Sequence, residues 1–380
     1  MRIAMLGTRG VPAAYSGFET CVEQVGKRLV ARGHEVVVYC RSGYRPHPNP
    51  PSQAGEGKMR EYLGMRLVTL PSIRTKGLDT LSHTALSTLW ALRRDRPDAA
   101  LIFGVGNAVF CRFFRRSRVG VAINVDGADW ARLKWGPIGR RYLRWSERVA
   151  VNTAGAVIAD SRAVAAYYKE HYHADTTFIP YGAEVPLESG TETLRRFNLE
   201  PRRYLLAVGR MVPENGFHDL IGAYAAVQPA MPLVIVGDAP YSEDYQRRLR
   251  EMAPASVIFT GYQFGTAYQE LSAHAYAFLF GAQVGGTHPV LVEQLAYGNA
   301  VLARWTESNA EVAQDAAIYF HDLPELEYGL AAVTTDPALV DARREQAKER
   351  ARAFSWDEVT DSYEALLVSV RSSFGRGANS

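Results

Sequence analysis

The stretch that most constrains the fold is residues 276–305. It begins with a short apolar run (AYAFLF), passes through a polar, glycine-rich turn (GAQVGGTHP), and then carries apolar residues at helical spacing up to Gly298. A second apolar run (NAVLA) follows directly. Short apolar runs are typical of buried strands, and apolar residues three and four apart are typical of helices. The stretch therefore predicts a strand–loop–helix–strand unit of an α/β sheet.

The start of the predicted helix has the features of an anion site. Thr287 or His288 can cap it, and Pro289 suits a first turn that needs no N–H donor. The free amides and the positive end of the helix dipole then face the crevice beyond the strands, where such sheets bind ligands. Glu293 lies one turn further on, where it can meet the ribose hydroxyls of a nucleotide. The alternative is a capped turn with Glu293 on a solvated helix face.

Composition excludes several classes of protein. The chain has 380 residues, enough for two domains, and its net charge of +3 argues against a general nucleic-acid binder. Its three cysteines are scattered, without a CxxC pair or a Cys/His cluster, so neither a disulfide framework nor a zinc site is expected. The chain shows no signal-peptide pattern and no run of about 18 apolar residues. We therefore expect a cytoplasmic protein without a metal centre.

Strands and helices alternate along the chain in two rounds. The first round opens with a strand, a loop rich in Gly, Pro and Ser, a helix at 18–32 and a second strand. Residues 183–203 are polar and predict a linker, after which the alternation restarts. We therefore expect an α/β protein with two Rossmann-like domains, at 1–185 and 186–354, facing one another across a cleft.

The loop after the first strand, GTRGVP, is not a dinucleotide-binding GxGxxG motif. The second strand ends at Arg41, where a dinucleotide site needs an acidic residue for the ribose, so no such cofactor is expected. The loop still lets a ligand approach the backbone closely near Gly10 and Gly17. Ser16 and Glu19 fit a capping box, and contact between Glu19 and a substrate is the alternative.

Two further candidates in the second domain suit a nucleotide ligand. Gly209 and Arg210 end its first predicted strand, and an arginine beside the crevice suits bidentate binding of a diphosphate. The alternative is a surface ion pair with Glu214. Tyr262 follows another predicted strand, where it can stack on a nucleobase or be an ordinary rim or core tyrosine.

In the first domain, Asp126 follows a predicted strand, in the segment that runs from Asn124 to Trp130. Its carboxylate can bind a sugar hydroxyl or accept a proton from an acceptor hydroxyl. The alternative is an Asx turn before Gly127.

Basic and aromatic side chains gather between residues 110 and 148. They are Arg112, Arg115, Arg116, Arg118, Arg132, Lys134, Arg140, Arg141, Arg144 and Arg148, with Phe110, Phe113, Phe114, Trp130, Trp135 and Trp145. This mixture is typical of a surface that lies on an anionic membrane. Ordinary solvated helix faces are the alternative, and no DNA or RNA motif is present to bind a nucleic acid instead.

Six sequence blocks resemble, in order, those of family 4 glycosyltransferases. They are MRIAMLGTRGVPAAYSGFETCVEQVGKRLVARGHEVVVYCR, NVDGADWARLKW, VIADSRAV, FIPYGAE, LAVGRMVPENGF and VGGTHPVLVEQLAYGNAVLA. The first and last blocks resemble a bacterial branch that includes rhamnosyltransferases of surface-polysaccharide assembly, while many relatives share the middle ones. The resemblance spans essentially the whole chain.

The resemblance implies a GT-B fold, in which a C-terminal helix at about 355–372 crosses back onto the first domain. It implies transfer of a sugar from a nucleoside-diphosphate donor to a hydroxyl of a glycan or lipid-linked acceptor, with retention and without a metal. By alignment of the blocks, Arg210 would bind the donor diphosphate and Asp126 the sugar near the reacting carbon, and we expect these two to be the catalytic residues. We also expect Glu19, Asp126 and Trp130 on the acceptor side. The implied donor-binding residues are Gly17, Gly209, Arg210, Tyr262, Thr287, His288 and Glu293.

Three positions depart from the resemblance. Asn215 stands where many relatives have a lysine, and Gly285 where the wider family has a glutamate. The branch often has an acid two places before that, where this chain has Gln283. These departures leave two alternatives: a non-catalytic sugar-nucleotide or glycan-binding protein, and a GT-B epimerase that acts on the nucleotide sugar itself.

Overall fold

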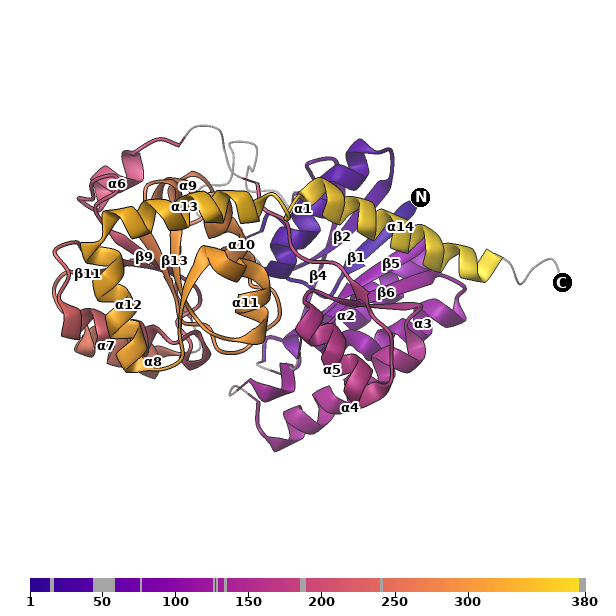
Figure 1. The fold of residues 1–380 in the computed structure, drawn as a ribbon. Helices are drawn as coiled ribbons and strands as arrows, with labels where there is room; N and C mark the ends of the chain where they lie inside the picture. Colours follow the sequence, from indigo (N-terminus) through magenta and orange to yellow (C-terminus); the bar gives the residue numbers. More distant parts are fainter. Residues whose placement is uncertain are drawn as a thin grey trace. The chain divides into compact units, whose positions relative to one another are not determined.

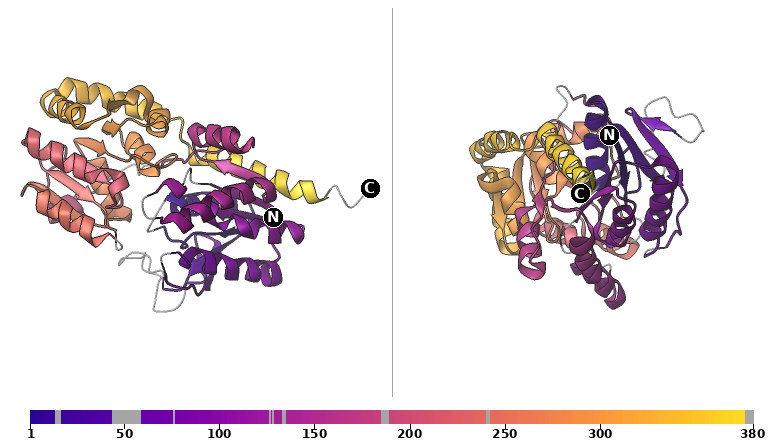
Figure 2. Two further views of the ribbon diagram at one scale, coloured as in Figure 1. Left: turned by 90° about the horizontal axis from the view of Figure 1, so that it is seen from below. Right: turned by 90° about the vertical axis from the view of Figure 1, so that its right-hand side faces the viewer.

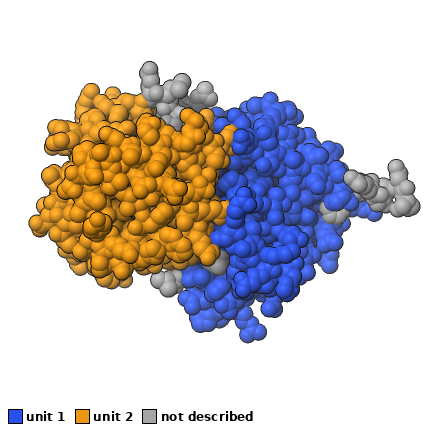
Figure 3. All heavy atoms as spheres, viewed as in Figure 1, with its two compact units in different colours: residues 1–181, 356–380 blue, residues 182–355 orange. Residues whose placement is uncertain are grey.

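The structure is a computed structural model. It describes residues 1–13, 17–43, 59–75, 77–125, 127, 129–132, 135–184, 189–239 and 242–375. The chain divides into two compact units, Met1–Tyr181 with Trp356–Ser380, and Gly182–Ser355 (Figure 3). Each unit has its own sheet of parallel strands and its own hydrophobic core.

Eight strands form the sheet of the first unit, in the order β3-β4-β2-β1-β5-β6-β7-β8 (Figure 1). Their bounds are β1 (Arg2–Leu6), β2 (Glu35–Arg41), β3 (Glu61–Tyr62), β4 (Met65–Leu70), β5 (Ala99–Phe103), β6 (Gly120–Asn124), β7 (Ala156–Ala159) and β8 (Thr177–Phe178). Among the strands that the structure describes in this sheet, only the short edge strand β3 is antiparallel to its neighbour. The central strands are buried throughout, as expected for parallel strands covered on both faces.

Helices cover both faces of this sheet. On one face lie α1 (Gly17–Ala31) and α14 (Trp356–Gly375), and on the other α2 (Asp79–Trp90), α3 (Cys111–Arg116), α4 (Pro137–Thr153) and α5 (Arg162–Tyr172). Shorter helical segments connect these elements: the π-helical η1 (Ala91–Asp95) and the 3₁₀ segments η2 (Val105–Phe110) and η3 (Asp129–Ala131). The C-terminal helix α14 packs beside α1, the first helix of the chain (Figure 2). Arg28 bonds Asp357 at 2.8 Å across this contact, and Arg32 bonds Glu364 at 2.7 Å.

The second unit has a six-stranded, wholly parallel sheet in the order β11-β10-β9-β12-β13-β14. The strands are β9 (Leu205–Val208), β10 (Leu233–Val236), β11 (Val257–Gly261), β12 (Ala277–Phe280), β13 (Ala300–Arg304) and β14 (Ala317–Phe320). One face of this sheet carries α6 (Glu192–Arg196), α9 (Gly265–Ala273), α10 (Pro289–Ala296), α11 (Glu307–Ala313) and α13 (Pro337–Ala351). The other face carries α7 (Phe217–Val227), α8 (Glu243–Met252) and α12 (Leu323–Thr335). Two single 3₁₀ turns complete the unit, η4 (Pro213–Asn215) and η5 (Gln314–Ala316).

The α/β class with two parallel sheets agrees with the prediction from the sequence, whereas the linker predicted at 183–203 is wrong in part. Helix α6 forms inside that stretch, and Leu194 and Leu199 enter the core of the second unit. Glu270 on α9 accepts a hydrogen bond from the amide of Thr193 at 2.6 Å, which anchors the helix. The stretch reads as polar because only a few of its side chains are buried.

Three loops at the carboxyl edge of the second sheet touch one another through their backbones. The amide of Gly209 donates to the carbonyl of Val236 at 3.0 Å, and that of Gly237 donates to Gly261 at 2.9 Å. Gly237 has φ +144°, and a Cβ there would lie 1.9 Å from the carbonyl oxygen of Gly209. This edge therefore leaves no room for a side chain at position 237.

We expect Gly237→Ala to lower the free energy of unfolding by about 3 kcal/mol, because the new methyl group forces the Gly209 and Gly237 loops apart in a backbone conformation that suits glycine. Urea unfolding followed by circular dichroism measures this loss. The matched control is Gly222→Ala within α7, where a Cβ meets no atom within 4 Å; it should raise stability by about 0.5–1 kcal/mol. Equal stability of Gly237→Ala and the parent would contradict the packing described here.

Candidate active site

The strand order of the second sheet defines where a ligand can bind. Strand β9 lies between β10 and β12, and the chain leaves β9 toward β10 but leaves β12 toward β13. Sheets of this kind bind ligands where the strand order reverses, beyond the carboxyl ends of the strands. Here that point lies between two loops, residues 209–216 after β9 and residues 281–288 after β12.

These two loops are joined to each other and to the helix behind them. The amide of Gln283 donates to the carbonyl of Glu214 at 2.9 Å. The buried side chain of Asn309, on α11, donates to the carbonyl of Ala282 at 3.0 Å. The groups that the loops carry are therefore held at a fixed spacing.

Arg210 projects from the first of these loops and is partly buried. Among the residues that the structure describes, its guanidinium forms no ion pair, so the alternative of a pair with Glu214 does not hold. Asn215, which replaces the lysine of many relatives, donates from Nδ2 to the carbonyl of Arg210 at 2.7 Å. The backbone of Arg210 is thus fixed while its charge is available.

The second loop leads into the N-terminus of α10. His288 is its N-cap, with extended φ −87° and ψ 112°, and Pro289 opens the first turn. The side chain of His288 makes no capping hydrogen bond; its ring packs edge-on against Phe280 at 5.1 Å. The neighbouring Thr287 is buried, and the amide of Val290 has no acceptor among the described residues. This end of the helix therefore offers an N–H group and the positive end of the dipole to an anion.

Gly285 is explained by the position of His288. Gly285 has φ +146°, and a Cβ on it would lie 2.8 Å from Cε1 of His288. The imidazole therefore occupies the space into which a longer side chain at 285 would extend. In this chain the glutamate of the wider family could not fit without moving His288, while Gln283 is exposed.

Glu293 does not lie on a solvated helix face, because its carboxylate is partly buried and hydrogen-bonded. The hydroxyl of Tyr268 donates to Oε2 of Glu293 at 2.5 Å. Burial raises the pKa of Glu293 to about 7, and the hydrogen bond from Tyr268 opposes that rise. Tyr268 is not among the residues predicted from the sequence, because 25 residues separate it from Glu293 and no short motif links the two.

Tyr262 lies beyond β11, where the chain turns at Gly261. Its ring stacks on Phe264 with centroids 5.5 Å apart and an interplanar angle of 21°. Both rings are partly buried. Tyr262 therefore belongs to a small aromatic platform at the carboxyl end of a strand, two strands away from β9.

In the first unit, Gly17 is the first residue of α1, and the chain itself uses the carboxylate of Glu19. Glu19 is 2% exposed, and its Oε1 accepts a hydrogen bond from the amide of Arg9 at 2.8 Å. This contact fixes the loop that follows β1. The expected capping box cannot be assigned, because Ser16 lies outside the described residues.

Trp130 lies in a polar network in the first unit. Its Nε1 donates to the hydroxyl of Tyr167 at 3.1 Å, and the guanidinium of Arg144 lies 4.0 Å from its ring. Tyr167 and Tyr172 donate to Glu147 at 3.1 and 2.5 Å, and burial raises the pKa of that carboxyl. Trp130 is thereby anchored to α4 and α5. Asp126, four residues earlier, lies outside the described residues.

The predicted basic and aromatic cluster separates into core and surface members. Phe114 is buried in the core, Trp130 and Trp135 pack against it, Arg132 pairs with Asp129 at 2.8 Å, and Lys134 lies outside the described residues. The exposed members lie on α3, on α4 and two residues after α3: Arg112, Arg115, Arg116, Arg118, Arg140, Arg141, Arg144 and Arg148, with Phe113, Ile138 and Trp145. In α3 and α4, both described throughout, the sole acidic side chain is the buried Glu147.

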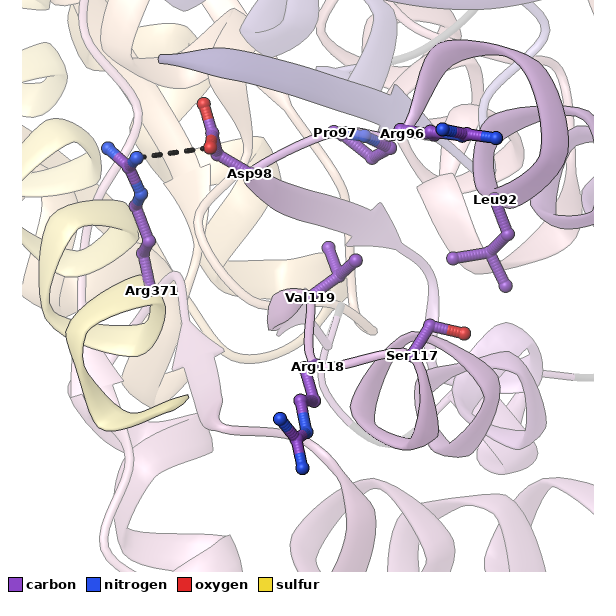
Figure 4. Close-up of a pocket in the computed structure, with 8 residues that line it drawn as sticks. All are labelled: Leu92, Arg96, Pro97, Asp98, Ser117, Arg118, Val119 and Arg371. Atoms are coloured by element: carbon purple, nitrogen blue, oxygen red, sulfur yellow. Dashed lines mark ion pairs between the residues drawn. The ribbon is translucent and has the colours of Figure 1, made fainter. Parts of the chain in front are cut away.

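A hollow of about 480 Å³ lies elsewhere on the first unit. It is lined by residues that precede β5 and β6 and by Arg371 of α14. Figure 4 shows Arg371 facing Asp98, at 3.1 Å, while the guanidinium groups of Arg96 and Arg118 lie apart from that pair and from each other. The hollow lies at the amino ends of these strands, opposite the edge where such sheets bind ligands. The hollow is therefore separate from the ligand-binding edge of this sheet.

Among the described residues, no group of three or more His, Cys, Asp or Glu side chains is placed to hold a metal ion. No helix within the described ranges combines the length and the apolar character needed to cross a bilayer.

Comparison with known families identifies the second unit. Residues 191–353 match the family of glycosyl transferases group 1, and residues 1–184 match a domain of unknown function, DUF1972. The uncharacterized glycosyltransferase YqgM of Bacillus subtilis (strain 168) is 31% identical over 109 residues, which are 28% of this chain and 29% of that protein. The second unit is therefore a group 1 glycosyl transferase domain, and the rhamnosyltransferase branch stays a prediction.

Solved structures establish the fold of the whole chain. Sucrose-phosphate synthase from Thermosynechococcus elongatus is similar with a TM-score of 0.80 at 18% identity, over 98% of this chain and 99% of that one. Anabaena HepE in complex with UDP-glucose has a TM-score of 0.77 at 18% identity, over 97% and 100%. WaaG, a glycosyltransferase of lipopolysaccharide biosynthesis, has a TM-score of 0.71 at 18% identity, over 97% of this chain and 99% of that one. The chain therefore has the predicted GT-B fold.

The raised pKa of Glu293 makes stability depend on pH in a definite direction. A folded pKa of about 7, above the ordinary 4.5, means that the folded state holds the proton more tightly. The stabilisation is complete below about pH 4.5 and is lost as pH rises through about 7. Between about pH 5 and 8.5, this titration should lower the free energy of unfolding of the parent by about 2 kcal/mol, and Glu293→Gln should abolish that change.

Urea unfolding at several pH values measures the effect, with Glu200→Gln, an exposed glutamate of the same unit, as the matched control. The control should keep the pH dependence of the parent. If Glu293→Gln kept it too, Glu293 would not be the titrating group.

Proposed function

We propose that this protein is a retaining, metal-independent glycosyltransferase that uses a nucleoside-diphosphate sugar as donor. Its acceptor would be a hydroxyl of a glycan or lipid-linked glycan of a bacterial cell-surface polysaccharide, and rhamnose is the sugar that the branch resemblance favours. The observation that carries the proposal is the placement of Arg210 and the N-terminus of α10 in a group 1 glycosyl transferase domain. They lie on the two sides of the point where the strand order of the sheet reverses.

The diphosphate would lie between these two groups. Arg210 can bind two of its oxygens in a bidentate manner, and the Val290 amide with the α10 dipole can bind another. A guanidinium and a helix terminus together can neutralise much of the charge of the leaving nucleoside diphosphate, which is why we propose transfer without a metal. The ribose would then meet Glu293, and the base would lie against Tyr262.

The chemical step follows from this placement. The bond between the anomeric carbon and the diphosphate oxygen breaks, and charge builds up on the leaving oxygen where Arg210 and α10 can stabilise it. The sugar passes through an oxocarbenium-like state, and the acceptor oxygen attacks from the face that the diphosphate leaves, so that configuration is retained. The leaving phosphate can take the acceptor proton, so a strong protein base is not needed.

The remaining predicted residues would complete the donor sugar and acceptor sites. We assign Thr287 and His288 to the phosphates or the sugar, and Gly209 and Gly17 to backbone that allows close approach of the donor. Asp126 would bind the sugar near the reacting carbon. Trp130 and Glu19 would shape the acceptor side, Glu19 through its hold on the loop after β1.

The relatives favour this class of substrate. The structure of Anabaena HepE holds UDP-glucose, and WaaG acts in lipopolysaccharide biosynthesis. Both observations belong to those proteins, and they support a nucleotide-sugar donor and a surface-glycan acceptor for this one.

The first test is Arg210→Ala, assayed with a panel of nucleoside-diphosphate sugars for release of the nucleoside diphosphate and for sugar transfer to glycolipid acceptors. Loss of one preorganised charge should lower turnover by about 10²–10³-fold. Arg203→Ala, an exposed arginine of the same domain, should keep the activity of the parent.

Near-parent turnover in a folded Arg210→Ala protein would contradict the assignment of Arg210. Donor binding by the parent without any turnover would favour the non-catalytic alternative, and an altered nucleotide sugar formed without acceptor would favour the epimerase.

We also propose that the exposed face of α3 and α4 lies on an anionic membrane, where a lipid-linked acceptor would be found. Eight exposed arginines lie there or next to α3 without an exposed acidic side chain on either helix. Ile138, Trp145 and Phe113 are 87%, 47% and 38% exposed, so apolar groups lie among the charges. Such a face attracts anionic headgroups and can insert apolar side chains between them.

Sedimentation with phosphatidylcholine vesicles, with and without phosphatidylglycerol, tests this surface. The double variant Arg140→Glu/Arg141→Glu should weaken binding to the anionic vesicles at least about 30-fold, since each basic residue contributes about 1 kcal/mol. Arg203→Glu/Arg248→Glu, with the same change of charge in the second unit, is the control and should bind like the parent. Binding of the parent that does not depend on phosphatidylglycerol would count against the surface.

A further inference from the structure

The two oxygens of the Glu293 carboxylate differ in their hydrogen bonds. Oε2 accepts the hydroxyl proton of Tyr268 at 2.5 Å. Oε1 accepts no hydrogen bond from any residue that the structure describes. One oxygen of the side chain is therefore fixed by the protein, and the other remains for a ligand.

Tyr268 is itself fixed from behind by a polar network on α9 and α10. Nε2 of Gln294 lies 3.2 Å from the Tyr268 hydroxyl and donates to Oγ of Ser272 at 2.8 Å. Asn299 donates to Oε1 of Gln294 at 2.7 Å and to the carbonyl of Ser272 at 2.8 Å. Gln294, Ser272 and Asn299 are fully buried, so this network has little freedom to rearrange.

The place of Tyr268 in the fold connects two parts of the proposed nucleotide site. It lies in the first turn of α9, the helix that directly follows the loop carrying Tyr262, and its partner Glu293 lies on α10. One hydroxyl group thus ties the helix after the proposed base-binding loop to the residue proposed to meet the ribose.

We propose that Tyr268 is a positioning residue of the donor site, whose hydroxyl holds Oε2 of Glu293 so that Oε1 accepts a ribose hydroxyl of the donor. This inference rests on the proposed function and adds a residue to its nucleoside end. Tyr268 acts only through Glu293 and makes no proposed contact with the donor.

The charge state of Glu293 gives this role a measurable consequence. Ribose hydroxyls donate to an ionised carboxylate, and burial raises the pKa of Glu293 to about 7 while the Tyr268 hydrogen bond lowers it. Glu293 raises the pKa of Tyr268 on α9 and of Tyr297, the residue directly after α10. Among the described residues, Tyr268 is the sole side chain that shifts the pKa of Glu293, and no side chain of α11, α13 or β13 does so. Removal of the Tyr268 hydroxyl should therefore favour the protonated, poorly accepting form.

The experiment is calorimetric titration of the full-length protein with UDP, GDP, ADP and dTDP between about pH 5.5 and 8.5. Affinity of the parent for its nucleotide should rise with pH through about 7. Tyr268→Phe, which keeps the ring and removes one oxygen, should move that rise upward by about one pH unit and weaken binding about fivefold at pH 7. Tyr297→Phe, the matched change on a ring without a hydrogen bond to Glu293, should keep the midpoint of the parent.

Glu293→Gln isolates the carboxylate. This variant should lose the rise with pH, and adding Tyr268→Phe to it should change the midpoint no further. Circular dichroism spectra and thermal unfolding establish that each variant is folded. If Tyr268→Phe fails this control, Gln294→Leu replaces it, because that change removes the support behind Tyr268. Carboxyl carbon-13 NMR then compares the titration of Glu293 in the parent and in Gln294→Leu.

The outcomes separate this inference from the proposed function. A parent protein that binds none of the four nucleotides overturns the nucleotide-dependent transferase itself. A parent that binds one of them, with an unchanged midpoint in folded Tyr268→Phe, overturns the positioning role of Tyr268 and leaves the transferase in place.

Discussion

Direct contact between backbones at the carboxyl edge of the second sheet is the constraint on which the candidate site depends. The loops after β9, β10 and β11 meet at Gly209, Gly237 and Gly261 without intervening side chains, and the loop after β12 is bonded to the carbonyl of Glu214. Loops in such contact cannot move independently. Arg210 and the start of α10 are consequently presented at a spacing that the fold fixes before any ligand arrives, which is what electrostatic stabilisation of a leaving group requires.

Arg202 and Arg344 in the second unit serve a different purpose from Arg210. At the amino edge, Arg202 donates to the carbonyl of Ala275 and Arg344 to that of Tyr276, both at 2.6 Å, and burial lowers the pKa of each guanidinium. These side chains satisfy carbonyl groups of the protein. At the carboxyl edge, Arg210 keeps partial contact with water and has no ion-pair partner in the described part of the chain. Its charge therefore remains for an external anion.

Both units hold a partly or fully buried carboxylate with tyrosine hydroxyls instead of with a cation. Tyr268 bonds Glu293 in the second unit, and Tyr167 and Tyr172 bond Glu147 in the first. A neutral donor fixes the direction of a carboxylate without cancelling its charge, whereas an arginine would lower the pKa strongly and occupy both oxygens. In the second unit the Tyr268 hydrogen bond opposes the rise of the Glu293 pKa that burial causes, and one carboxylate oxygen accepts no hydrogen bond from the described residues.

The sequence by itself determined the parts of this protein that depend on local pattern. Residues 276–305 predicted the unit β12–loop–α10–β13, because strands covered on both faces must be apolar throughout and helices must bury one stripe. It also located Arg210 and Pro289, since a residue that follows a strand or opens a helix is fixed by that element. Only the tertiary structure decided what those residues meet. Tyr268 reaches Glu293, His288 fills the space beside Gly285, and α6 forms inside a polar stretch because Glu270 and the core receive it. Such contacts join residues that the crossovers of the sheet bring together from distant positions, and no periodicity along the chain records them.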